Sequence, residues 1–286
     1  MLKKLWKKFG PNPLDRKLRK AASKGCKTIL IPWNRGMGDI ALGLYPIVHR
    51  IREFIPEAKV TFLIRPDLQE GFQLFKGVEV LVANDWARGK PALLPADLPP
   101  FDLILENADP SHWVAHLRGK LISKMEWDST WDALCERFNL PQGCIAAHVH
   151  CETGYYFERN WTAEKWQELF SSLDEPIVLF GLKKEPVFHH PNLFDLRGET
   201  NLFEILSILK NKCRCLIAPD SGILVMAYFL NVPFKLKVVS IWADPNHGIL
   251  KQNVPSPNAL LEHIPVISPN RKDAALIPVE EVRRAL

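Results

Sequence analysis

The chain has 286 residues, of which 47% are hydrophobic and 24% are charged. This composition excludes a disordered chain and suits two ordinary globular domains or one large one. No apolar run reaches the ~20 residues of a transmembrane helix. The six cysteines form no Cys-x-x-Cys pair, so we expect reduced, packed thiols in a cytoplasmic protein rather than a zinc site.

The net charge of +5 is concentrated at the N-terminus. Residues 1–24 hold nine lysines and arginines and one aspartate, a net charge of +8, which leaves −3 for the rest. Because the net positive charge is confined to one segment, no nucleic-acid partner is expected. Leu2, Leu5, Trp6 and Phe9 follow helical spacing. Residues 1–24 are therefore predicted to be a basic amphipathic appendage, peripheral on the anionic inner face of the cytoplasmic membrane; the alternative is a solvated tail.

Residues 28–55 are typical of a strand, a glycine turn and a helix. The turn is Arg35-Gly36-Met37-Gly38-Asp39, and Asp39 precedes apolar residues at helical spacing. Three interpretations remain open. Gly36-x-Gly38-x-x-Ala41 fits a dinucleotide-binding turn, and Arg65 after the next strand could suit NADP, although the Asp39 carboxylate would repel a pyrophosphate. Asp39 could instead cap its helix, or be a reacting group held in a cleft.

Strands and helices alternate along the whole chain, which predicts an α/β protein with two doubly wound parallel sheets. The expected strands are 28–32, 60–64, 78–82, 103–106, 145–149, 176–180, 214–218 and 236–241. The expected helices are 40–55, 67–75, 111–125, 129–138, 162–172, 201–210, 221–230 and 279–286. A turn at 140–143 suggests an N-terminal domain of residues 25–141 and a C-terminal domain of residues 142–286.

A second strand–turn–helix contains Asp220-Ser221-Gly222. The Ser221 hydroxyl and the backbone N–H groups of Gly222 and Ile223 could hold a phosphate, although helix capping alone is the alternative. Arg159 lies between a strand and a helix and could neutralise a phosphate. Glu185 follows a strand and Gly181, and could accept hydrogen bonds from a ribose. Both could equally be solvated surface charges.

Seven motifs, in one order along residues 28–248, resemble those of the bacterial heptosyltransferases, glycosyltransferase family 9. They are Gly38-Asp39, Arg159 before Trp161, Gly181 with Glu185, Leu202-Phe203-Glu204, Asp220-Ser221-Gly222, Asn231-Val232-Pro233 and Asp244-Pro245. The resemblance implies a GT-B fold, with two Rossmann-like domains facing a central cleft. The acceptor would bind the N-terminal domain and the nucleotide-sugar donor, usually ADP-heptose, the C-terminal one. The last helix would return to the first domain.

The resemblance also implies residue roles in an inverting sugar transfer to a lipopolysaccharide-core-type acceptor. Asp39 matches the general base, and Arg35, Gly36 and Gly38 form the turn on the acceptor side. The donor is expected to be held by Arg159, Glu185, Asp220, Ser221, Gly222 and Ile223. Neither a cofactor nor a metal ion is expected.

The chain departs from the family pattern at two donor-side positions. Val225 stands where the family has a histidine, and Ile241-Trp242-Ala243 replaces a Gly-Pro pair. These changes leave open a family member with another donor or without catalysis. An NADP-dependent oxidoreductase is a further alternative.

Overall fold

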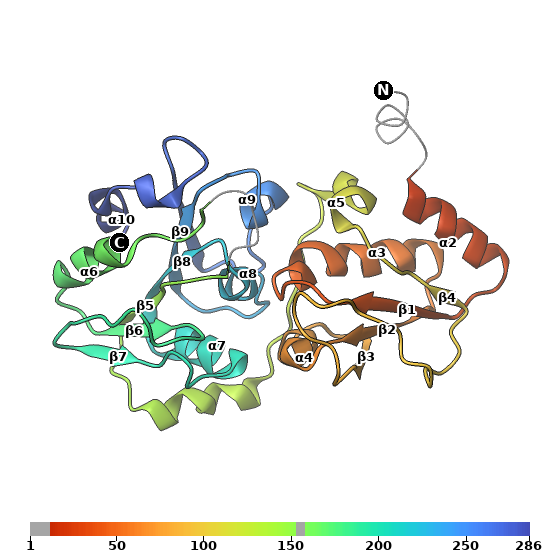
Figure 1. The fold of residues 1–286 in the computed structure, drawn as a ribbon, viewed down its shortest axis with the longest axis horizontal. Helices are drawn as coiled ribbons and strands as arrows, with labels where there is room; N and C mark the ends of the chain where they lie inside the picture. The colour runs from red at the N-terminus through yellow and green to blue at the C-terminus, as the bar shows by residue number, and fades with distance from the viewer. Residues whose placement is uncertain (1–11, 153–157) are drawn as a thin grey trace. The chain divides into compact units, whose positions relative to one another are not determined.

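The computed structural model describes residues 12–152 and 158–286 (Figure 1). The chain forms two compact units, unit 1 (Met1–Leu121) and unit 2 (Ile122–Leu286). In the part that is described, no helix has the length and apolar character needed to span a bilayer. All six cysteines are buried and free.

Unit 1 is built on a four-stranded parallel sheet in the order β3-β2-β1-β4. Its strands are β1 (Thr28–Trp33), β2 (Lys59–Ile64), β3 (Glu79–Val82) and β4 (Leu103–Ile104). Consecutive residues of β1 and β2 are buried, as expected for strands covered on both faces. The strand order reverses between β1 and β4, and the turn after β1 therefore lies at a switch point of the sheet.

The helices of unit 1 are shorter than the sequence predicts. After β1 they are η1 (Ile40–Leu44), α3 (Tyr45–Phe54), η2 (Pro66–Leu68), α4 (Gln69–Gln73), α5 (Pro110–Trp113) and η3 (Ala115–Leu117). The helix expected at 40–55 begins as the π-helical η1, and Pro46 occupies the first turn of α3, where a missing N–H costs nothing. The helix expected at 111–125 ends early, before Gly119, whose φ of 71° is left-handed.

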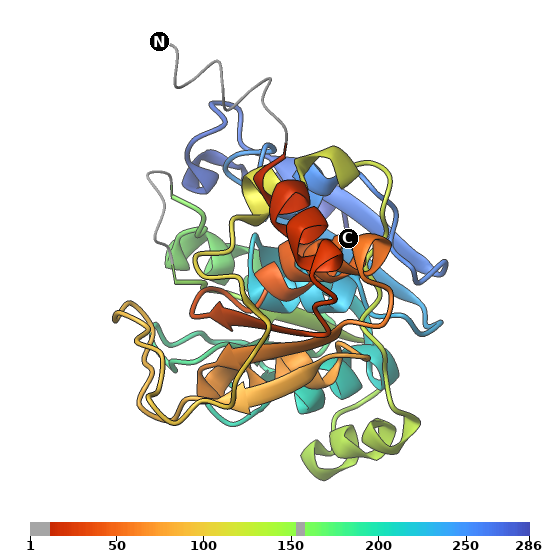
Figure 2. The same ribbon diagram turned by 90° about the vertical axis from the view of Figure 1, so that its right-hand side faces the viewer.

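Residues 12–24 differ from the expected appendage because they belong to the body of unit 1. They form α2 (Pro13–Ser23), which packs against α3 (Figures 1 and 2). Leu14 and Leu18 are fully buried, and Asp15 pairs with Arg50 at 2.7 Å. The apolar face of α2 is therefore already covered, and only its basic face is exposed. The expected helix of Leu2, Leu5, Trp6 and Phe9 lies outside the described residues.

Unit 2 contains a six-stranded parallel sheet in the order β10-β9-β8-β5-β6-β7. The strands are β5 (Cys144–His148), β6 (Ile177–Phe180), β7 (Leu193–Asp195), β8 (Cys213–Pro219), β9 (Leu236–Trp242) and β10 (Leu261–Ile267). From β5 the chain first adds β6 and β7 on one side of the sheet, and then β8, β9 and β10 on the other. This is the doubly wound arrangement, with its switch point between β5 and β8. The predicted α/β class with two parallel sheets is confirmed; β7 and β10 were not predicted.

The helices of unit 2 include the end of the chain. After β5 they are α6 (Ala163–Ser171), α7 (Leu202–Asn211), α8 (Gly222–Tyr228), α9 (Gly248–Gln252), η5 (Ala274–Leu276) and α10 (Val279–Arg284). The last helix was expected to return to the N-terminal domain, but α10 packs against α6. Val282 lies in the unit 2 core, and Lys237 Nζ donates to the Leu286 carbonyl at 2.8 Å.

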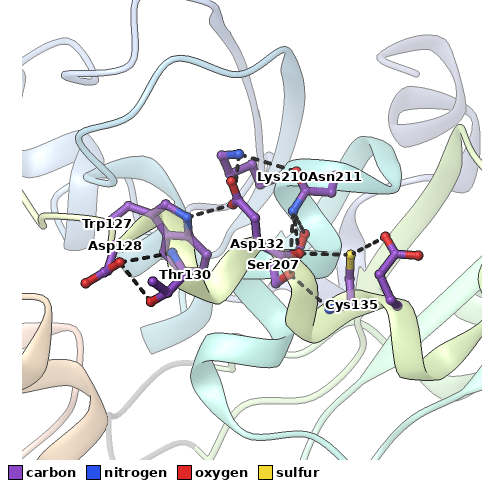
Figure 3. A network of polar contacts seen from close by, with 9 residues as sticks. Trp127, Asp128, Thr130, Asp132, Cys135, Ser207, Lys210 and Asn211 are labelled. Atoms are coloured by element: carbon purple, nitrogen blue, oxygen red, sulfur yellow. Dashed lines mark hydrogen bonds and ion pairs between the residues drawn. The ribbon is translucent and has the colours of Figure 1, made fainter.

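The boundary between the units precedes the expected position at residue 141 because η4 (Ser129–Phe138) packs on α7 (Figure 3). The Asp132 carboxylate lies 2.9 Å from Lys210 Nζ and accepts from Trp127 Nε1 at 2.8 Å. The Ser207 hydroxyl donates to the Asp132 carbonyl at 2.8 Å and accepts from the Cys135 N–H at 3.1 Å. These contacts attach residues 122–141 to unit 2.

Candidate functional site

The candidate donor site of unit 2 lies where β5 and β8 end. These neighbouring parallel strands flank the switch point, where α/β sheets commonly bind their ligands. His148 is the last residue of β5, and Asp220 and Ser221 follow β8 directly. Strand order therefore brings together side chains that are more than seventy residues apart in the chain.

Arg159 and Asp220 are in direct contact in this site. Arg159 Nη1 donates to the Asp220 carbonyl at 2.8 Å and lies 3.6 Å from Asp220 Oδ2, while Nη2 donates to the Glu152 carbonyl at 2.6 Å. Burial raises the pKa of Asp220, and the nearby Arg159 guanidinium and His247 ring oppose this rise. The predicted partners Arg159, Asp220 and Ser221 are thus brought together.

Ser221 caps α8, and its hydroxyl also contacts His148. Ser221 Oγ accepts from the Leu224 N–H at 3.3 Å and lies 3.1 Å from His148 Nδ1. Burial lowers the pKa of His148 to about 4, so the ring is neutral at pH 7 and carries a single N–H. With that hydrogen on Nδ1, Ser221 Oγ accepts twice and its own hydrogen can reach a ligand. With the hydrogen on Nε2, Ser221 donates to His148 instead.

The remaining predicted donor residues lie in different surroundings. Gly222 and Ile223 are half-buried in the first turn of α8, next to Ser221. Glu185 is exposed in the loop after β6, two strands from β8 in the sheet. Val225, which stands where the resemblance would place a histidine, is 1% exposed in the core. A basic side chain at position 225 would therefore be buried in this protein.

The loop between β9 and α9 adds residues that sequence reasoning did not assign. His247 Nε2 lies 3.2 Å from Asp244 Oδ2. Gly248 has a φ of +49°, and a Cβ there would meet Asp220 Oδ1 and lie 2.6 Å from the Trp242 ring. The first residue of α9 thus lies close to Asp220. The motif Asp244-Pro245 marked this segment in the sequence but gave no sign of the contact.

The candidate site of unit 1 is the turn between β1 and η1. Asp39 is half-buried, and Asp39 Oδ2 accepts from the Gly36 N–H at 3.2 Å. Asp39 has right-handed helical backbone angles, and its side chain makes no capping hydrogen bond to η1. The interpretation of Asp39 as a simple helix cap is therefore wrong; its carboxylate closes the turn instead.

The glycines of this turn do not have the special backbone angles that the sequence suggested. Neither Gly36 nor Gly38 is among the residues with positive φ. A Cβ on Gly36 would lie 3.5 Å from Asp39 Oδ2, an ordinary contact. Arg35 is exposed, and its guanidinium lies 5.3 Å from the centre of the Trp33 ring.

Arg65 is a structural residue in unit 1. It is 2% exposed, and its Nε and Nη2 donate to the Asp67 carboxylate at 2.7 and 2.9 Å. Its Nη1 donates to Asn34 Oδ1 at 2.8 Å, and Asn34 in turn donates to the carbonyl of Lys90 at 2.9 Å. Arg65 thus ties together the ends of β1 and β2. A guanidinium that is already buried and paired is poorly suited to receive a ribose 2′-phosphate.

Metal ligands do not gather anywhere in the described residues, where no group of three or more His, Cys, Asp or Glu side chains could hold an ion. The candidate donor site of unit 2 offers the Arg159 guanidinium, the Ser221 hydroxyl and backbone N–H groups at the start of α8. Groups of this kind bind phosphate.

Comparison with solved structures finds the same fold in sugar transferases. A glycosyltransferase family 9 protein from Veillonella parvula is 14% identical, with a TM-score of 0.61 over 91% of this chain and 95% of that chain. The Escherichia coli heptosyltransferase WaaC with ADP-2-deoxy-2-fluoro heptose is 12% identical, with a TM-score of 0.54 over 90% and 98%. WaaC with ADP is 14% identical, with a TM-score of 0.53 over the same shares.

No protein-family model matches the chain, and no curated protein sequence matches it. At such low identities the structural likeness establishes the fold. The comparison therefore confirms the GT-B fold of two Rossmann-like units, which the resemblance of the sequence motifs to glycosyltransferase family 9 implied.

Proposed function

We propose that this protein is an inverting glycosyltransferase that moves a sugar, heptose, from a nucleotide-diphosphate donor to a lipopolysaccharide-core-type acceptor. The observation that carries the proposal is the contact of Arg159 with the Asp220-Ser221 loop at the β5/β8 switch point. The fold in which it occurs is shared with a heptosyltransferase that holds ADP. Membership of glycosyltransferase family 9 is part of the same proposal.

Asp39 is the general base in this mechanism. Its carboxylate takes the proton from an acceptor hydroxyl while that oxygen bonds to the anomeric carbon and the bond to the nucleoside diphosphate breaks. A positioned base contributes roughly 10²–10⁴-fold to the rate. The Gly36 N–H holds Asp39 Oδ2 at 3.2 Å and so orients the carboxylate before the acceptor binds.

Arg159, the Ser221 hydroxyl and the backbone N–H groups of Ser221, Gly222 and Ile223 stabilise the leaving diphosphate. The guanidinium can form charge-assisted hydrogen bonds to phosphate oxygens. The His148 tautomer with hydrogen on Nδ1 leaves the Ser221 hydroxyl hydrogen for the ligand. Because these groups supply the charge, the transfer is proposed to need no metal ion, and turnover should persist in excess EDTA.

The first test is binding of nucleotides, measured by thermal shift with ADP, ADP-heptose, UDP, GDP and NADP. A ligand at 100 times its dissociation constant stabilises the folded protein by about 2.7 kcal/mol. Stabilisation by ADP or ADP-heptose supports the proposal. A shift with NADP alone would favour the oxidoreductase, and no shift with any ligand would favour a member without a donor site.

The second test separates catalysis from binding with Asp39→Ala. We expect loss of ADP release from ADP-heptose in the presence of acceptor, while ADP still stabilises the protein. Asp85→Asn, at an exposed carboxylate of the same unit, should keep full activity. Normal turnover by Asp39→Ala would refute the assignment of the base. Binding without transfer in the wild type would support the non-catalytic alternative.

The acceptor is proposed to be presented by the inner face of the cytoplasmic membrane. The exposed basic side chains of α2 are Arg16, Lys17, Arg19 and Lys20. Each well-placed charge contributes about 1 kcal/mol on an anionic surface. Because the apolar face of α2 packs in unit 1, this contact is electrostatic at α2. We expect cosedimentation with anionic vesicles that is lost in high salt, and none with neutral vesicles.

A further inference from the structure

His247 is a basic side chain next to the Arg159–Asp220 pair that the mechanism above does not use. Its neighbour Gly248 lies so close to Asp220 that a Cβ on it would meet Asp220 Oδ1. The His247 side chain is 25% exposed, so its ring remains accessible to a ligand. Arg159 and Asp220 are only 11% and 10% exposed.

The carboxylates of this cluster lie beside basic side chains. Asp220 Oδ2 lies 3.6 Å from Arg159 Nη1, and Asp244 Oδ2 lies 3.2 Å from His247 Nε2. The exposed Lys251, one turn into α9, also acts on Asp244. With a neutral imidazole, the carboxylates of Asp220 and Asp244 balance Arg159 and Lys251. A diphosphate would then meet no net positive charge.

We propose that His247, as an imidazolium, is a second basic residue that binds the donor diphosphate beside Arg159, an inference that rests on the function proposed above. Protonation of His247 gives the cluster a net positive charge on the side of the β9–α9 loop. The nearby His148 cannot fill this role, because it is buried at the end of β5 and neutral at pH 7. The ring of His247 thus supplies the second cation of the site.

The proposal predicts that binding of a diphosphate takes up a proton. A nearby anion favours the imidazolium form over the neutral ring, so the complex with a diphosphate holds more protons than the empty site. By linkage, affinity falls as the pH rises. Adenosine, which has no phosphate, should show no such dependence. Because the terminal phosphate of ADP itself titrates at about pH 6, the readout is the difference in pH dependence between the wild type and His247→Gln, which a purely structural role of His247 would not produce.

The experiment measures ADP and adenosine binding to the full chain by calorimetry at about pH 6 and about pH 8. We expect the wild type to bind ADP about tenfold more tightly at the lower pH, the effect of one charge-assisted hydrogen bond. His247→Gln should bind ADP weakly at both values, with adenosine unchanged. His247→Lys, which stays charged, should bind ADP tightly at both. The matched control is His189→Gln, at an exposed histidine in the β6–β7 loop.

Each outcome separates this inference from the proposed function. If ADP binds the wild type and His247→Gln with the same affinity and pH dependence, the role of His247 is refuted and the donor site stands. If His247→Gln loses adenosine as well, or His247→Lys fails to restore ADP binding, His247 is structural and the inference is refuted. If no nucleotide binds the wild type, the proposed function fails, and the inference with it.

Discussion

Replacement of Gly248 by alanine should disturb the candidate donor site through a single methyl group. Gly248 has a φ of +49°, and its Cβ would lie 2.6 and 2.8 Å from two carbons of the Trp242 ring and would also meet Asp220 Oδ1. The ring cannot withdraw easily, because Trp242 is fully buried and its Nε1 donates to Ser240 Oγ at 2.6 Å. Unless the backbone of residue 248 shifts, both Trp242 and Asp220 must therefore move.

The cost of this change has two parts. A left-handed backbone costs a residue with a Cβ about 1–2 kcal/mol. Forcing an added methyl group into packed surroundings costs about 1–3 kcal/mol more. We therefore expect Gly248→Ala to lower the free energy of unfolding by about 3 kcal/mol in total.

Gly143→Ala is the matched control, because it isolates the steric part. Gly143 also lies in unit 2 and has a φ of +79°, but a Cβ there would have no atom within 4 Å. Both variants carry the backbone strain, and only Gly248→Ala carries the overlap. The expected difference of about 2 kcal/mol corresponds to about 4–8 °C in melting temperature for a domain of this size.

Thermal unfolding and ADP binding should be measured on both variants. We expect Gly248→Ala to have a lower melting temperature than Gly143→Ala. It should also bind ADP more weakly, because the displaced Asp220 belongs to the loop with Ser221 and Gly222 that is proposed to bind the phosphates. Equal losses of stability in the two variants would show that residue 248 can move away from Trp242 and Asp220 at no cost, which would refute the argument from close packing. If the two variants bind ADP equally well but Gly248→Ala is less stable, the overlap with Trp242 lowers stability without disturbing the donor site.

Two further predictions concern stability. Burial lowers the pKa of both His148 and His263 to about 4, so between about pH 6.5 and about pH 4 the unfolded chain takes up protons that the native protein refuses. Stability should fall over this window by about 3 kcal/mol per residue, and calorimetry of His148→Asn should show a shallower decline; an unchanged slope would contradict the burial argument. Leu18→Ala should cost about 3 kcal/mol because Leu18 is fully buried, whereas the exposed Arg16→Ala should cost less than about 0.5 kcal/mol. Equal urea midpoints for these two variants would mean that α2 is detachable.

The central strands were predictable because each is a short apolar run covered on both faces. β5, β8 and β9 fall within a residue or two of the expected ranges, and so do α6 and α7, which start with side-chain caps at Thr162 and Asn201. The strand β10 was missed because Leu261–Ile267 mixes polar and apolar residues and contains Pro265. A proline is tolerated there because β10 is an edge strand.

The role of α2 could not be read from local pattern. Leu14 and Leu18 at helical spacing among basic residues predict an amphipathic helix, and this is correct. The pattern does not say whether the apolar face meets lipid or protein. That choice depends on the exposed surface of α3 and on the Asp15–Arg50 pair, which joins residues 35 apart in the chain. Local periodicity fixes the helix, while its partner is set by tertiary packing.

The candidate donor site illustrates how strand order carries information that spacing lacks. His148 and Ser221 are 73 residues apart and share no motif, yet their side chains lie 3.1 Å from each other. Once a doubly wound sheet is predicted, β5 and β8 must be neighbours at its switch point, and the residues that end them must meet. The contact of His148, at the end of the first strand of unit 2, with Ser221 could therefore have been predicted from the sequence. The contact of Gly248 with Asp220 was not, because it depends on the path of a loop that no strand order dictates.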